Sequence, residues 1–223
     1  MGLPEHADGD GPRFFGVYPA LVTKITDDPA QLGRVQVRYP SLGTDGDRDV
    51  RGWATLCSPY ADKDQGLQVM PEVDSEVVVA FEAGDFRRGY IVGAAWNGKA
   101  AQPESPTAPN NIRVLRTRAD SRLEFNDTSG SSKISLTMKT GHKVVLNETP
   151  QEITITHANG CTITLNASGG IDITANSVVT VKAPSLNVNA PTSNFSGIVN
   201  CQTLVASVAI TSPMYSPGVG NIW

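Results

Sequence analysis

The sequence predicts an all-β protein: an N-terminal five-stranded barrel of the OB type, followed by an intertwined triple-stranded β-helix, or β-prism, that forms a needle. Three observations lead to this prediction. Short apolar and β-branched runs are separated by Gly, Pro, Asn and Asp, and no long stretch has a helical period. In the second half, short alternating runs recur at roughly eight- to ten-residue intervals, which is typical of a repeat. The eight runs predicted as strands are RLEFND, KISLTMKTG, KVVLNET, EITITHANG, CTITLNASGG, IDITANS, VVTVKAP and LNVNAP.

Five runs in the first part of the chain have the character of strands. In GRVQVRYP, the apolar Val35, Val37 and Tyr39 alternate with polar residues, so this strand has one apolar face. The other four runs are FFGVYPALVTKI, RGWATLCSP, SEVVVAFE and RGYIVGAAW, and turn-forming residues separate them. Five short strands within about a hundred residues fit a small closed barrel. We place this barrel over residues 14–98.

Two segments without strand character flank the barrel. Residues 1–13 have no apolar core of the signal-peptide type, so we expect a flexible polar arm and assembly in the cytoplasm. Residues 99–111 contain Pro103, Pro106 and Pro109, and spaced prolines form a semi-rigid extended linker. The domain boundary is expected in this linker.

Residues 112–212 are expected to form the needle. Each strand here has one apolar face, and no amphipathic helix follows to cover it. A single-chain β-helix would have only about three coils, which is short for a stacked repeat. A homotrimer would cover every apolar face and leave no lateral strand edge, so we favour it. The residues expected to line its axis are Ile163, Leu165, Ile171, Ile173, Val179, Val181, Leu186 and Val188.

Residues 213–223 are expected to form an apolar tip. No charged side chain occurs from Ala183 to Trp223. In a trimer three such ends would meet at one apex, and apolar surface exposed in one place marks a docking site. The candidate docking residues are Tyr215, Val219, Ile222 and Trp223. Alternatively, Trp223 plugs the axis of its own trimer.

Two residues of the repeat raise the question of an axial metal. His157 has the same parity as Ile153 and Ile155, so three imidazoles could converge on a threefold axis. The favoured alternative is that HANG is already a turn, which leaves His157 exposed. The three cysteines, Cys57, Cys161 and Cys201, are expected to be reduced, buried thiols and not a disulfide framework. Cys161 is expected to pack as a small hydrophobic residue. The sequence therefore predicts no bound metal and no cofactor.

The sequence resembles a known family at this point. The runs DPAQLGRVQVRYP and PEVDSEVVVAFEAGD resemble the barrel of the spike family that comprises phage baseplate assembly protein V, VgrG and the gp5-like spikes. The segment from Arg113 to Glu148 resembles the start of the β-prism in such spikes. The resemblance implies a homotrimeric central spike in the baseplate of a phage tail or contractile injection system. It also implies a PAAR-like tip protein at the C-terminal end, hub or tube proteins at the barrel, and transient contact with a target membrane.

Other functions have less support in the sequence. No catalytic motif of the hydrolase, zinc-protease or nucleotide-binding type occurs, so we do not expect an enzyme. The stretch RVLRTRADSR is basic but lacks the interleaved aromatic residues typical of a nucleic-acid site, and no nucleic-acid partner is expected. The alternative function is that of a passive trimeric fibre or adhesin that binds a surface receptor.

Overall fold

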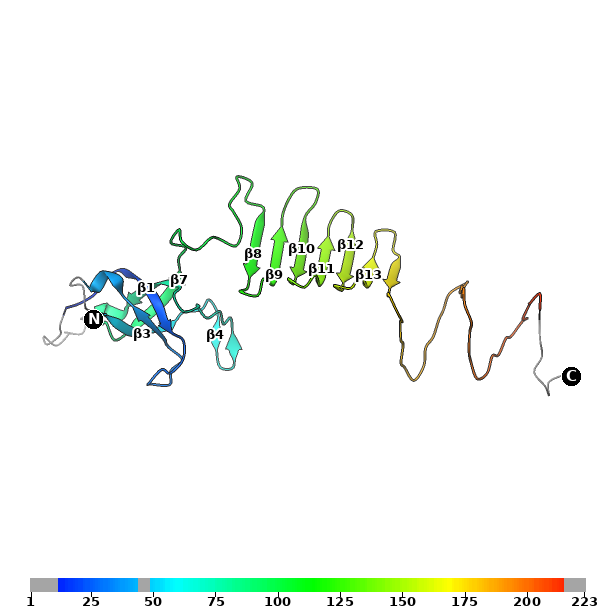
Figure 1. Ribbon diagram of the computed structural model, residues 1–223, viewed down its shortest axis with the longest axis horizontal. Helices are drawn as coiled ribbons and strands as arrows, with labels where there is room; N and C mark the ends of the chain where they lie inside the picture. The colour runs from blue at the N-terminus through cyan, green and yellow to red at the C-terminus, as the bar shows by residue number, and fades with distance from the viewer. Residues whose placement is uncertain (1–11, 44–48, 215–223) are drawn as a thin grey trace, which may run out of the picture. The chain divides into compact units, whose positions relative to one another are not determined.

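The computed structural model describes residues 12–43 and 49–214, and the chain divides into two units, 1–176 and 177–223. The first unit holds the strands, which confirms the all-β prediction (Figure 1). It contains a closed barrel, a small two-stranded hairpin and a seven-stranded sheet. The second unit is described separately below.

The barrel has the strand order β1-β2-β3-β7-β6, as the sequence predicts for an N-terminal five-stranded barrel. Its strands are β1 (Val17–Lys24), β2 (Val35–Arg38), β3 (Arg51–Leu56), β6 (Glu76–Phe81) and β7 (Gly89–Ala94). All neighbours pair antiparallel except β3 and β7, which pair parallel and close the barrel. Two short 3-10 turns, η1 (Pro40–Leu42) and η2 (Glu82–Gly84), follow β2 and β6.

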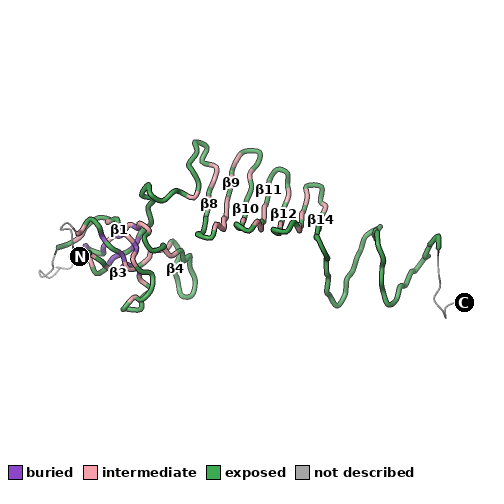
Figure 2. The backbone as a smooth tube through the Cα atoms, in the orientation of Figure 1, coloured by how far each residue is buried: buried purple, intermediate pink, exposed green. Residues whose placement is uncertain are grey.

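The barrel encloses the buried core of the described residues, shown in purple in Figure 2. Val35, Val37 and Tyr39 are all at most 1% exposed, as their alternation predicts. Most of the other core side chains are small and β-branched, which suits the narrow interior of a five-stranded barrel. One end is closed by aromatic side chains in mutual contact: Phe14, Tyr18, Tyr39, Phe81 and Phe86.

A two-stranded hairpin lies between β3 and β6 and was not expected from the sequence. It pairs β4 (Ala61–Asp62) with β5 (Gln65–Gly66). The hydroxyl of Ser58 donates to the backbone oxygen of Leu67 at 2.6 Å and so fastens the base of the hairpin. Each strand has only two residues and lacks an apolar alternation, so no sequence pattern indicates it.

The second sheet is a seven-stranded antiparallel meander with the order β14-β13-β12-β11-β10-β9-β8 (Figure 1). Its strands are β8 (Ile112–Arg116), β9 (Arg122–Asn126), β10 (Lys133–Thr137), β11 (Lys143–Asn147), β12 (Glu152–Thr156), β13 (Thr162–Leu165) and β14 (Ile171–Thr174). Strands β9 to β14 coincide with six predicted runs. Strand β8 was not predicted as a strand, because its sequence IRVLR was interpreted as part of a basic stretch.

Tight loops join consecutive strands of the meander. Gly141 and Gly160 have φ values of 98° and 92°, in the left-handed region that a side chain disfavours. The two loops have the same construction: the backbone N–H of each glycine donates to the residue three positions earlier, Met138 or His157. This pattern is typical of a three-residue hairpin loop with a glycine bulge.

The second unit, described from residue 177 to 214, contains extended chain and no paired strand within that range. The two runs predicted as strands, 178–184 and 186–191, therefore have no strand partner among the residues that the structure describes. A β-strand exists only where its backbone groups pair with a neighbour. The apolar side chains are exposed accordingly, from 58% for Val179 to 98% for Ile198.

Candidate functional site

The seven-stranded sheet has one face formed almost entirely by apolar side chains, which we call the apolar face. Strand register aligns these side chains in two columns. The first contains Leu115, Leu123, Leu136, Val144, Ile155, Ile163 and Ile173. The second contains Phe125, Ile134, Leu146, Ile153, Leu165 and Ile171. Every step along either column joins two directly paired residues, which gives a continuous apolar surface.

Most side chains of the apolar face are exposed in the part of the chain that the structure describes. Ile163 and Leu165 are each 39% exposed, and Ile171 and Ile173 are 66% and 60% exposed. Full burial of such a side chain stabilises a protein by about 1.5–3 kcal/mol. A sheet with thirteen large apolar side chains aligned on one open face therefore has a strong tendency to associate through that face.

The opposite face of the same sheet is mainly polar, and its apolar members are Ile112, Val114 and Val145. Thr154 pairs with Thr164, Thr156 pairs with Lys143, and Thr164 pairs with Asp172. Cross-strand threonine pairs are favourable in a sheet and remain compatible with water. The contrast between the two faces assigns the apolar face to association and the polar face to solvent.

The predicted axis residues divide into two groups. Ile163, Leu165, Ile171 and Ile173 lie on the apolar face, next to one another in the two columns. In the second unit, the predicted axis residues lie in unpaired extended chain and are 58–69% exposed: Val179, Val181, Leu186 and Val188. Their placement on a trimer axis stays a prediction. Four predicted tip residues, Tyr215, Val219, Ile222 and Trp223, lie outside the described residues.

His157 lies at the end of β12, where the predicted turn begins. Its backbone N–H donates to Cys161 at 2.9 Å, and its side chain is exposed in the chain. The sequence did not predict its neighbour: the ring of His142 lies 4.4 Å from that of His157, centroid to centroid. Among the described residues, no group of three or more His, Cys, Asp or Glu side chains is arranged to hold a metal.

The cysteines are free thiols, as expected, but they are less buried than predicted. Cys57 and Cys201 are exposed and Cys161 is intermediate. The expectation of buried thiols is therefore wrong for Cys57 and Cys201 in the single chain, because Cys57 leaves the barrel at the end of β3 and Cys201 belongs to the unpaired unit.

The run DPAQLGR forms an ordered loop between β1 and β2, and the contacts in that loop explain its residue types. The Asp28 carboxylate accepts hydrogen bonds from the backbone N–H groups of Ala30, Leu32 and Arg34, and the Arg34 guanidinium donates to it at 2.8 Å. The Arg34 side chain and these backbone donors hold the pKa of Asp28 far below its usual range. Gly33 has a φ of 67°, which a side chain would disfavour. Asp28, Gly33 and Arg34 must keep their spacing for this loop to form.

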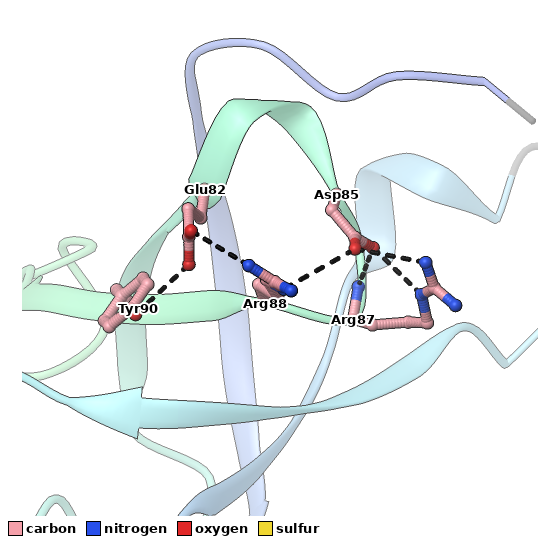
Figure 3. Close-up of polar contacts among 5 residues, drawn as sticks. All are labelled: Glu82, Asp85, Arg87, Arg88 and Tyr90. Carbon is pink, nitrogen blue, oxygen red and sulfur yellow. Dashed lines mark hydrogen bonds and ion pairs between the residues drawn. The ribbon is translucent and has the colours of Figure 1, made fainter. Parts of the chain in front are cut away.

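A second ordered turn, η2, has a set of ion pairs on the barrel surface (Figure 3). Arg88 lies 3.0 Å from Glu82 and 3.9 Å from Asp85, and Arg87 lies 3.1 Å from Asp85. The Tyr90 hydroxyl donates to Glu82 at 3.4 Å. The neighbouring Arg87, by side chain and by backbone N–H, lowers the pKa of Asp85. These charges are solvent-exposed and paired, so they make a rigid surface feature without the geometry of an acid–base pair.

Known protein families match the residues of both the barrel and the seven-stranded sheet. Residues 18–96 match the injector OB domain of type VI secretion systems and phage baseplates. Residues 112–173 and 135–197 match the C-terminal trimerisation domain of phage baseplate protein V, in two overlapping alignments. The chain belongs to the baseplate spike family.

Two relatives of this baseplate spike protein come from Vibrio cholerae serotype O1. The type VI secretion system spike protein VgrG3 is 27% identical over 133 residues, which are 57% of this chain and 13% of VgrG3. The actin cross-linking toxin VgrG1 is 26% identical over 133 residues, which are 57% of this chain and 12% of VgrG1. The chain thus spans about one eighth of these relatives. Within the described residues, no helix is both long and apolar enough to cross a membrane.

Proposed function

We propose that three copies of this chain form the central spike of a contractile injection system or a phage-like tail baseplate. The observation that carries this proposal is the uncovered apolar face of a sheet that matches a trimerisation domain. Three such faces turned toward a common axis would bury both apolar columns and leave the polar faces in water. The axis would then include Ile163, Leu165, Ile171 and Ile173.

The second unit supports the proposal in a different way. Its chain from 177 to 214 is extended, has no strand partner in its own chain within that range, and has apolar side chains that are largely exposed. Winding around two other copies would supply the missing backbone partners and cover those side chains. We accordingly divide the chain into an arm (1–13), a barrel (14–98), a linker (99–111), a triple-stranded spike (112–212) and a tip (213–223).

The proposed work of the spike is mechanical. A contracting sheath would drive it through a target envelope, with a PAAR-like protein bound at the tip and hub or tube proteins bound at the barrel. Lys182 is the last charged residue of the sequence. An uncharged leading end avoids the cost of about 2.5–3.5 kcal/mol for each charged side chain at mid-bilayer. The barrel surface near η2, where Phe15 is 68% exposed, offers a contact area for a hub protein.

The first test is the native mass of the full chain in solution. We expect three times the 23.6 kDa chain mass by light scattering, maintained in mild detergent. The variant Ile155→Glu places a carboxylate on the apolar face and is expected to abolish the trimer. The matched control, Thr156→Glu, places the same charge on the opposite face beside Lys143 and is expected to leave the trimer intact. A monomeric wild type, or equal effects of the two variants, would contradict the proposal.

The second test concerns the injection role. A particle assembled with the Ile155→Glu chain should fail to penetrate target cells, whereas the Thr156→Glu particle should behave as wild type. A purified trimer that binds cells tightly without any sheath would instead indicate a passive fibre or adhesin.

A further inference from the structure

His142 and His157 form a pair of imidazoles at the loop edge of the apolar face. The pairing of Lys143 with Thr156 places His142 directly opposite His157, one residue beyond the ends of β11 and β12. Alternation along the strands places both residues on the same side as Val144 and Ile155. Their ring centroids lie 4.4 Å apart, and the rings meet edge to face at 62°. The two imidazoles are therefore neighbours although fifteen positions separate them in the sequence.

The loop after β12 orients the His157 ring. Its Nδ1 lies 2.6 Å from the side-chain oxygen of Asn159. The same oxygen accepts the backbone N–H of Cys161 at 3.1 Å, which fixes the orientation of the Asn159 amide. The backbone N–H of Asn159 also lies 3.2 Å from this Nδ1. An amide oxygen only accepts hydrogen bonds, so the shorter contact, to the Asn159 oxygen, favours the tautomer in which Nδ1 carries the proton and donates it. The Nε2 atom of His157 then keeps its lone pair and is available as a ligand.

His142 is held more loosely. Its Nδ1 accepts only a long contact of 3.4 Å from the backbone N–H of Ala158. Moving its proton from Nε2 to Nδ1 would cost no more than this weak interaction. Its Nε2 can therefore also become a ligand, with little rearrangement of the loop.

We propose that His142 and His157 together bind a divalent transition-metal ion of the zinc or copper class, one ion per chain. Two nitrogen ligands on a tetrahedral zinc ion, each about 2.0–2.1 Å from the metal, lie about 3.4 Å apart. Rings with centroids 4.4 Å apart can present two Nε2 atoms at that separation through small rotations about χ2. Water would complete the coordination shell. Asn159 acts as a positioning residue, because its hydrogen bond sets the tautomer and the ring orientation of His157.

The site would have a structural effect. Strands β11 and β12 are joined at the opposite end of the sheet, so His142 and His157 lie at a point where no loop connects these two strands. A metal ion shared between them would cross-link this end of the strand pair. The contacts that carry this inference lie within one chain. Both imidazoles lie on the side of the apolar face, so the proposed trimer would bring three such pairs near its axis. Measuring the native mass of the titrated sample separates failure of this site from failure of the trimer.

The test is calorimetric titration of the full-length protein with zinc chloride, after treatment with a chelator. We expect one Zn²⁺ per chain. His142→Gln and His157→Gln should each weaken binding by about 100-fold, since two ligands on one scaffold bind far more tightly than one. Asn159→Ala should weaken binding by about 10- to 100-fold, whereas Asn159→Asp retains an acceptor for Nδ1 and should bind as wild type.

Two controls keep the result interpretable. Circular dichroism and native mass of each metal-free variant should match wild type, so that lost binding reports the site and not the fold. Cys161→Ser changes the next thiol along the same edge and should leave the affinity unchanged. The proposal would be overturned by a wild type that does not take up zinc, by His→Gln variants that bind normally, or by a Cys161→Ser variant that loses affinity as strongly as they do.

Discussion

Truncation of one side chain on the apolar face tests whether that face is buried in the assembled protein. Ile173 is 60% exposed in the single chain and pairs with Ile163 on β13. Truncation of a buried isoleucine to alanine costs about 2–5 kcal/mol of the free energy of unfolding. The exposed 60% of Ile173 contributes only after association, so Ile173→Ala should weaken the assembly by about 1–3 kcal/mol per chain, or roughly 3–9 kcal/mol per trimer.

The assay is the protein-concentration dependence of guanidinium unfolding, with the native mass measured in parallel. Ile173→Ala should unfold at a lower denaturant concentration than wild type at every protein concentration, and the midpoints of both should rise with protein concentration because folding is coupled to association. The matched control is Thr174→Ala, the next residue of β14 on the polar face. If the two variants shifted the midpoint equally, the apolar face would not be the buried interface and the reasoning would be wrong.

Two further predictions concern the barrel. Ion pairing with Arg34 and backbone hydrogen bonds lower the pKa of Asp28 in the folded state. The stabilising contribution of Asp28 is therefore present above the unfolded pKa of about 3.9 and is lost as the pH falls through the folded value. Asp28→Asn should lower the melting temperature at pH 7 and reduce the dependence of the melting temperature on acid pH, whereas Asp27→Asn should change neither quantity. Gly84 has a φ of 80°, and an added Cβ would lie 3.2 Å from atoms of Arg13 and Phe14. Gly84→Ala should therefore lower the free energy of unfolding of the barrel by about 1–3 kcal/mol, measured by chemical denaturation. The control Gly93→Ala should have little effect, because the space around Gly93 is open.

The barrel could be predicted because apolar residues that point into its core alternate with polar residues along the strand, and this alternation is visible in the sequence. Val35, Val37 and Tyr39 alternate with polar residues, and the structure buries these three. The β4–β5 hairpin was not predictable because each of its strands has two residues and is held by side chain-to-backbone contacts, such as that of Ser58. Strand β8 was not predicted because its two arginines, Arg113 and Arg116, led to an interpretation of this run as a basic stretch.

The candidate sites show a similar limit. The apolar face follows from alternation alone, since Ile163 and Leu165 must lie on one side of their strand. The pairing of His142 with His157 depends instead on the register between β11 and β12, which is fixed by the cross-strand pairing of the two strands. No local pattern in the sequence encodes that register. Likewise, whether the extended chain between 177 and 214 forms paired strands depends on neighbouring chains, which one sequence does not describe.

The glycine loops at Gly141 and Gly160 have a consequence for how such proteins diversify. Each loop closes a self-contained pair of strands with the same local geometry, so duplicating one pair would extend the sheet by about 10 Å without disturbing the register of its neighbours. Length could thus change during evolution in discrete steps, by copying a short stretch of gene, while the ends of the molecule remain as they are.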